Sequence, residues 1–298
     1  MHGVKPVAQA NQESDIPWPL SMRWPLAIWR GVFAPDVKAF QPVQGQDPVL
    51  ARGQYLVEGL GHCGACHTPR SITMQEKALN NDEGSDFLSG SNAPIDGWTA
   101  SNLRGDGRDG LGRWSEDDLV QFLRMGRNDH TAVFGGMTDV VQHSLQHLTA
   151  EDATAIARYL KSLGAKDPNQ VGFTPDDTVA KALWKGDDSK TGASVYVDSC
   201  AACHKTDGSG YARFFPELRG NPVVLASDPT SLIHIVLSGA QLPGMKGAPT
   251  AITMPAFGWR LNDQQVADVV NFIRTSWGNT ATSTVTASDV AEVRKDEA

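Results

Sequence analysis

"GLGHCGACHTPR", residues 59–70, contains two cysteines separated by two residues and followed at once by a histidine. The same arrangement recurs in "DSCAACHKTD", residues 198–207. This pattern is the attachment motif of c-type haem, in which the cysteines form thioether bonds to the porphyrin and the histidine ligates the iron. The sequence therefore predicts two covalently bound haem c groups. The expected attachment residues are Cys63, Cys66, Cys200 and Cys203, and the expected iron-ligating histidines are His67 and His204.

These four cysteines are the only ones in the chain, so none is left over for a disulfide or a separate reactive thiol. Two other interpretations were weighed. A zinc site is disfavoured because a histidine follows each cysteine pair directly and because zinc ligand pairs usually lie closer together. A thioredoxin-like redox pair needs a βαβ context, which neither flank suggests. Covalent haem is the preferred interpretation.

Length and composition set further limits. The chain has 298 residues, and domains usually contain roughly 100–150 residues, so two domains are expected. With 40% hydrophobic and 20% charged residues, the chain is globular rather than disordered or membrane-spanning. A net charge of −8 and the lack of a basic run argue against binding to nucleic acid.

The expected location follows from the haem, because bacteria complete this attachment outside the cytoplasmic membrane. We therefore expect the protein in the periplasm or on the periplasmic face of that membrane. The first ten residues, "MHGVKPVAQA", have neither the apolar core nor the cleavage site of a signal peptide. The expectation is a mature, trimmed chain or a fragment.

An internal repeat organises the chain. Residues 148–163 align without gaps on residues 261–276, and both begin with a helix-capping residue, Thr149 or Asn262. Apolar residues then recur at helical spacing in both segments. Two earlier segments, "WSEDDLVQFLRMG" and "DPTSLIHIVLSG", form a second matched pair of expected helices, each ending at a glycine.

Each repeat is therefore expected to contain, in order, a helix, a haem motif, a long loop, a helix, a loop and a terminal helix. The sequence predicts an all-α fold with two tandem domains, at residues 49–165 and 166–278. Residues 1–48, rich in tryptophan and proline, are expected to form an extended strap. This strap packs on its own domains or serves as a docking surface for a partner subunit or the membrane. Residues 279–298 are expected to form a mobile tail.

Methionine is the expected ligand on the other side of each iron. Met137 and Met254 occupy equivalent positions, in the loop before each terminal helix. Met245 is the alternative in the second domain, whereas Met125 falls inside an expected helix. Ligation by a second histidine is disfavoured because no other histidine has a partner in the repeat; the candidates are His130, His143, His147 and His234.

Both repeats resemble class I cytochromes c, and the whole chain resembles the multihaem cytochrome c subunits of membrane-bound periplasmic dehydrogenases. These dehydrogenases oxidise alcohols, aldehydes, gluconate, sorbitol, fructose or glucose. The resemblance covers roughly residues 1–288. It rests on "DIPWPLSMRWPLAIWR", "GHCGACHTPR", "GLGRWSEDDL", "GGMTDVV", "DSCAACH", "DPTSL", "MPAF" and "DVVNFIRTSWGN".

This resemblance implies an electron-transfer subunit with no substrate chemistry of its own. A flavin- or pyrroloquinoline-quinone-dependent subunit oxidises the substrate, and the cytochrome relays electrons to ubiquinone or another respiratory acceptor. Family members usually carry three haems, whereas this sequence has motifs for two, so a truncated chain or a two-haem variant is expected. A free-standing di-haem carrier and a di-haem peroxidase are the alternatives; a peroxidase needs one iron that can open to peroxide.

The resemblance also implies residues around the haems. The proline that corresponds to Pro216 in small cytochromes c presents its carbonyl to the other ring nitrogen of the iron-ligating histidine, here His204. Trp98, Trp114 and Trp259 are candidates for walls of the haem pockets or for hydrogen bonds to propionates. Ordinary core packing is an equally good interpretation of these three tryptophans.

Overall fold

A computed structural model describes residues 5, 7–10, 16–19, 21–36 and 38–295. The remaining parts of the predicted strap and tail, at residues 1–4, 6, 11–15, 20, 37 and 296–298, lie outside the described residues. The chain divides into two compact units, Met1–Phe40 and Gln41–Ala298. We describe each unit by itself.

The described part of the first unit contains helix α1 (Trp24–Phe33), where the sequence predicts an extended strap. Pro25 lies in the first turn of α1, a position at which a missing amide hydrogen costs no helical hydrogen bond. None of the residues of α1, all of which the structure describes, is buried. Among the described residues, no helix has the length and apolar character needed to cross a bilayer.

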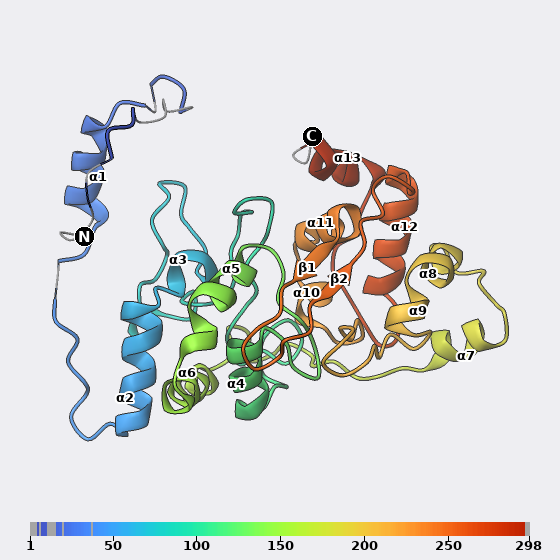
Figure 1. The fold of residues 1–298 in the computed structure, drawn as a ribbon, viewed down its shortest axis with the longest axis horizontal. Coiled ribbons are helices and arrows are strands. Elements are labelled where there is room, and N and C mark those ends of the chain that lie inside the picture. The colour runs from blue at the N-terminus through green and yellow to red at the C-terminus, as the bar shows by residue number, and fades with distance from the viewer. Residues whose placement is uncertain (1–4, 6, 11–15, 20, 37, 296–298) are drawn as a thin grey trace. The chain divides into compact units, whose positions relative to one another are not determined.

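The second unit is mainly helical (Figure 1). Its first half, residues 41–165, contains α2 (Pro48–Gln54), the π-helix η1 (Tyr55–Leu60), α3 (Gly64–His67), the 3₁₀ helix η2 (Asn81–Glu83), α4 (Glu116–Met125), α5 (Gly136–His143), the 3₁₀ helix η3 (Leu145–His147) and α6 (Ala150–Ser162). Its second half, residues 166–298, contains α7 (Thr178–Trp184), α8 (Ala193–Ser199), α9 (Ala201–His204), α10 (Pro222–Leu225), α11 (Thr230–Ser238), β1 (Ala240–Leu242), β2 (Ile252–Met254), α12 (Asp263–Arg274) and α13 (Ala287–Lys295).

The expected terminal helices and their caps are present. Ser115, Thr149 and Asn262 each accept a hydrogen bond from the backbone amide three residues later, at the starts of α4, α6 and α12. Gly126 ends α4 in the left-handed conformation, with φ of 68°. At the start of α11, Pro229 takes the capping position and the Asp228 side chain accepts from the amide of Thr230.

The same helix crossing builds each half. In the first half, α2 packs against α6, and Gly53 lies directly on the backbone of Ala155: a Cβ at Gly53 would be 2.0 Å from the Ala155 carbonyl oxygen. In the second half, α8 packs against α12, and a Cβ at Gly192 would be 2.2 Å from the Asp268 carbonyl oxygen. A glycine therefore permits the close crossing in both halves.

Buried side chains form three clusters. The first-half core includes Leu56, Phe87, Trp114 and Tyr159, and the second-half core includes Tyr196, Phe272 and Trp277. A third cluster, called the shared cluster below, consists of Val133 and Val141 from the first half and Leu242 and Met245 from the second. The two halves therefore share buried apolar packing within one unit.

Besides helix α1 in the predicted strap, two further expectations differ from the structure. The all-α prediction omits β1 and β2, which form an antiparallel pair in the second half. The predicted mobile tail is also wrong for residues 287–295, which form α13 and pack on α11 and α12 with Val290 fully buried. The Arg294 side chain fixes this helix by donating to Asp263 and to the carbonyls of Gly258 and Leu261.

Candidate haem-binding sites

The first motif lies at the short helix α3. Cys63, Cys66 and His67 are spaced i, i+3 and i+4, so one turn of helix places the three side chains on the same side. His67 Nδ1 lies 2.8 Å from the Ser101 carbonyl oxygen, 34 residues later in the long loop. The ring is thereby held through Nδ1.

The second motif repeats this construction at α9, with Cys200 directly before the helix and His204 at its end. His204 Nδ1 lies 2.8 Å from the Pro216 carbonyl oxygen, the contact that the resemblance implies. Both motif histidines therefore pair Nδ1 with a backbone carbonyl at the same distance.

This geometry suits iron ligation. When Nδ1 donates its hydrogen to a carbonyl, Nε2 carries the lone pair that binds a metal, and the hydrogen bond makes that nitrogen more basic. Burial lowers the pKa of both His67 and His204, so both rings stay neutral as a ligand must be.

The cysteines also suit covalent attachment, because all four carry free thiols. Burial raises the pKa of Cys63 to about 11 and that of Cys200 to about 12, so these thiols are protonated at neutral pH. Each motif thus offers two thiols for the thioether bonds to the porphyrin and one neutral imidazole for the iron, as haem c requires.

The structure places the two candidate methionines on different elements. Met254 lies in β2, opposite Ala240, and packs against the second-half core. Met137 lies in the first turn of α5 and packs against the shared cluster. Both are half-buried. The expectation of two similar loops is wrong, since one residue is helical and the other is in a strand.

The alternative methionines have packing roles. Met245 is 2% exposed and belongs to the shared cluster, which also contains Val133 and Val141 of the first half. Met125 ends α4 and packs against Gly247. Each of these two side chains therefore fills space between the halves.

The tryptophans divide into three situations. Trp114 is buried in the first-half core and stacks on His130, with ring centroids 5.8 Å apart. Trp98 stacks on His234 of the second half, with centroids 4.0 Å apart. Trp259 is exposed, and its indole N–H donates to the Ala256 carbonyl. Trp98 and Trp114 thus contact residues at the junction between the halves.

Ser101 is a site residue that the sequence reasoning missed. A repeat signal was nevertheless present, because "LRG" occurs both at residues 103–105 and at residues 218–220, in each case beginning two residues after the carbonyl-bearing position. Aligning these triplets pairs Ser101 with Pro216. The different loop lengths, 34 residues against 12, hide this correspondence when spacing from the histidine is used alone.

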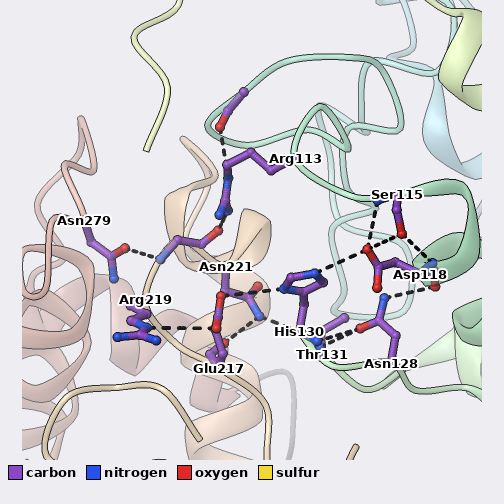
Figure 2. A network of polar contacts seen from close by, with 12 residues as sticks. Arg113, Ser115, Asp118, Asn128, His130, Thr131, Glu217, Arg219, Asn221 and Asn279 are labelled. Atoms are coloured by element: carbon purple, nitrogen blue, oxygen red, sulfur yellow. Dashed lines mark hydrogen bonds and ion pairs between the residues drawn. The ribbon is translucent and has the colours of Figure 1, made fainter. Parts of the chain in front are cut away.

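The other missed residues lie where the halves meet (Figure 2). His130, from the first half, lies between the carboxylates of Asp118 and Glu217, at 3.5 and 3.7 Å. Arg113 donates to the Gly220 carbonyl across the same junction. Because the sequence was read as two separate domains, it offered no reason to pair these residues.

Comparison with known proteins finds cytochrome subunits of several dehydrogenases among the matches. The chain is 80% identical over 298 residues to the gluconate 2-dehydrogenase cytochrome c subunit of Pantoea cypripedii. This alignment covers 100% of this chain and 68% of that protein. The chain is 52% identical over 295 residues to the cytochrome c subunit of the quinone alcohol dehydrogenase of Gluconobacter oxydans, covering 99% and 61%. It is 34% identical over 313 residues to the fructose dehydrogenase cytochrome subunit of Gluconobacter japonicus, covering 99% and 62%.

These matches extend over nearly the whole of this chain but only 61 to 68% of the length of the three relatives. A family model described as "Cytochrome c" matches residues 189–277, within the second half.

Proposed function

Because the chain belongs to the family of dehydrogenase cytochrome c subunits, which transfer electrons rather than catalyse the oxidation, we propose that it carries two haem c groups and relays electrons between them. The electrons come from a dehydrogenase subunit and leave towards a respiratory acceptor. Haem iron, when bound, supplies the one-electron chemistry. The chain itself supplies attachment, iron ligands and fixed geometry.

The observation that carries the proposal is the matched pair of histidine contacts. His67 and His204 each follow a Cys-x-x-Cys pair, and each holds Nδ1 2.8 Å from a carbonyl oxygen. In both copies this contact leaves Nε2 as the ring nitrogen that can bind iron, directly after the two cysteines that attachment requires. The proposed domains are class I cytochrome c units at residues 49–165 and 166–278, preceded by the segment 1–48 and followed by 279–298.

The proposed ligand set is His67 with Met137 in the first half and His204 with Met254 in the second. Two thioether-ligated irons have no open position, which suits electron transfer. The relatives bear the names of gluconate, alcohol and fructose dehydrogenases and do not favour a free carrier or a di-haem peroxidase.

The proposed partner is a flavin- or pyrroloquinoline-quinone-dependent dehydrogenase subunit, and the proposed acceptor is ubiquinone. The proposed location is the periplasm or the periplasmic face of the membrane. Helix α1 supports a docking role, because large apolar residues of α1 are exposed, with Trp24 64% and Val32 67% accessible. Removing such apolar side chains from water by covering them with a partner or a lipid interface is energetically favourable.

The decisive measurement is the intact mass of the protein expressed with a haem-attachment system. We expect two haem additions in the unaltered chain, and one in each of the double variants C63A/C66A and C200A/C203A. A single addition in the unaltered chain would contradict the two-haem proposal. A dehydrogenase subunit should co-purify with the native protein. If the protein were instead a monomer that turns over peroxide rapidly, the electron-transfer assignment would be wrong.

A further inference from the structure

Each carbonyl that pairs with a motif histidine lies in a loop that the other half of the unit holds. The carbonyl of Ser101, which pairs with His67, is in the first half, but the residues just before it bind α11 of the second half. The carbonyl of Pro216, which pairs with His204, is in the second half, but the loop around it binds residues 128–131 of the first. The support is therefore reciprocal.

The contact to the first loop is made mainly by Ser231. Its hydroxyl accepts from the Thr99 amide at 2.8 Å and lies 2.8 Å from the Thr99 hydroxyl. Ser231 is 1% exposed, so these hydrogen bonds are shielded from water. His234, one turn later on α11, places Nδ1 3.1 Å from the Gly97 carbonyl while its ring stacks on Trp98. Two turns of α11 thus fix residues 97–99.

The contact to the second loop is made by the segment that contains His130 (Figure 2). The Glu217 amide donates to the His130 carbonyl at 3.0 Å, and the Arg213 amide donates to the Asn128 carbonyl at 3.3 Å. Arg213 also pairs with Asp129, at 2.9 Å. These contacts bracket Pro216 on both sides.

The His130 side chain joins the halves a second time. Its two ring nitrogens face carboxylates, Nε2 towards Asp118 of α4 and Nδ1 towards Glu217. Both nitrogens can donate only in the imidazolium form. Besides the Arg213–Asp129 pair, Arg219 and Arg113 face Glu217, and Lys161 faces Asp118. Without the imidazolium, two carboxylates would face each other across the junction.

The position of these carbonyls has a chemical consequence. The hydrogen bond from Nδ1 sets the orientation and basicity of an iron-ligating histidine, and both properties tune the iron. A loop displaced by the loss of its support would weaken that hydrogen bond. The reduction potential and the electronic structure of the iron would then change, although no residue of its own half had been altered.

We propose that each half positions the iron-ligating histidine of the other half, with Ser231 acting on His67 through residues 97–101 and His130 acting on His204 through residues 213–217. Ser231 and His130 are positioning residues rather than ligands. This inference rests on the proposed function, in which both motifs carry haem.

The test is paramagnetic NMR of the oxidised holoprotein. Haem-methyl resonances are assigned to each half by their proximity to the β-protons of Cys63 and Cys66, or of Cys200 and Cys203. We expect Ser231→Ala to shift the resonances of the first-half haem and His130→Ala to shift those of the second-half haem. His130→Gln keeps a hydrogen-bond donor, so it should shift these resonances less than His130→Ala does.

The Ser231 arm has a second readout. A weaker Nδ1 hydrogen bond makes the ligand less basic, which favours reduced iron. At a fixed electrode potential, the ratio of reduced to oxidised first-half haem should rise about threefold, or about 28 mV at 59 mV per tenfold. The potential of the second-half haem should stay unchanged.

Matched controls are Ser238→Ala, at the exposed end of the same helix as Ser231, and His147→Ala, an exposed histidine of the same half as His130. Neither should move a haem-methyl resonance. Shifts confined to the half that carries each substitution, equal shifts in both haems, or no shift would each overturn the inference. The absence of one complete haem-methyl set would instead refute the two-haem proposal, and the crossed effect would still be measured on the haem that is present.

Discussion

The loops that support the two motif histidines make the same contact in different ways. In the first half, 34 residues separate His67 from the Ser101 carbonyl, and in the second half 12 residues separate His204 from the Pro216 carbonyl. Both contacts are 2.8 Å long. The hydrogen bond is therefore the constant feature, whereas the length and composition of the loop that delivers it vary.

The two loops also differ in how they are held. The first is fixed by the neutral hydroxyls of Thr99 and Ser231 and by the stack of Trp98 on His234. The second is fixed by backbone hydrogen bonds to residues 128–130 and also by charged groups, with His130 between Asp118 and Glu217. We therefore expect the Ser231 contact of the first loop to depend less on pH than the His130 side-chain contact of the second. Each prediction below probes a property that the halves share or one in which they differ.

The largest effect is expected from the proposed methionine ligands, which the halves share. The far-red sulfur-to-iron band of the oxidised protein should lose intensity in Met137→Ala and in Met254→Ala, and disappear in the double variant. The potential of the affected haem should fall, because thioether ligation raises it. Absorption spectroscopy with a redox titration measures both.

Met245→Leu is the control for this experiment, because Met245 fills the shared cluster. It should leave the band intact and cost less than about 1.5 kcal/mol of unfolding free energy, as volume-conserving core substitutions do. A band that persists in the double variant would contradict the ligand assignment.

The next effect concerns the helix crossings. Gly192→Ala places a Cβ 2.2 Å from the Asp268 carbonyl oxygen and requires φ of 84° from a residue with a side chain. We expect a loss of about 4 kcal/mol from overpacking and backbone strain together. Gly53→Ala meets the Ala155 carbonyl at 2.0 Å without a positive φ, so about 2 kcal/mol is expected.

Denaturant unfolding of the haem-loaded protein measures this difference. Gly164→Ala, where a Cβ would meet no atom within 4 Å, is the matched control and should change stability by less than about 1 kcal/mol. Equal losses in Gly53→Ala and Gly192→Ala would mean that the backbone conformation at Gly192 adds no strain.

The smallest expected effect is a difference in pH dependence between the loop supports of the two halves. Hydrogen bonding to Glu217, with the charge of Asp118, raises the pKa of His130 despite its burial. A raised pKa in the folded state means that this contribution to stability is fully present below the unfolded pKa, about 6.5, and is lost as pH rises through the folded pKa. The expected size is below about 1 kcal/mol, because the three side chains keep some contact with water.

The measurement is the unfolding free energy of His130→Gln relative to the unaltered chain across this pH range. The cost of the substitution should shrink as pH rises. For comparison, the cost of Ser231→Ala should change less. A cost of His130→Gln that is independent of pH would contradict the charged state of the junction.

Local signals in the sequence were enough for the helices and their caps. Ser115, Thr149 and Asn262 each begin a helix because their side chains satisfy an amide that the helix leaves free. The motif histidines were also predictable, since the spacing of the cysteines specifies them. Both kinds of prediction depend on residues within one turn of each other.

Helix α13 shows a local signal that was overlooked. Thr286 and Asp289 form a reciprocal cap, the Thr286 amide donating to the Asp289 carboxylate and the Asp289 amide to the Thr286 hydroxyl. The polar composition of residues 279–298 suggested mobility instead. Val285 and Val290 are buried in the second-half core and Val293 packs against it, while Arg294 holds the helix from its polar side.

The junction could not be predicted in this way. Met245 reads as a possible ligand because a methionine in a glycine- and proline-rich loop looks the same whether it faces an iron or a neighbouring core. Its burial in the shared cluster depends on residues more distant in sequence than any periodicity reaches. The same holds for His130, whose carboxylate partners lie on both sides of the junction.

The shared cluster has a consequence for synthesis. Val133 and Val141 are buried by Leu242 and Met245, which leave the ribosome much later. Until then, this apolar face of the first half is uncovered. A chaperone that protects this face during that interval would favour correct packing over aggregation. The packing of the first half is therefore complete only after most of the second half has been synthesised.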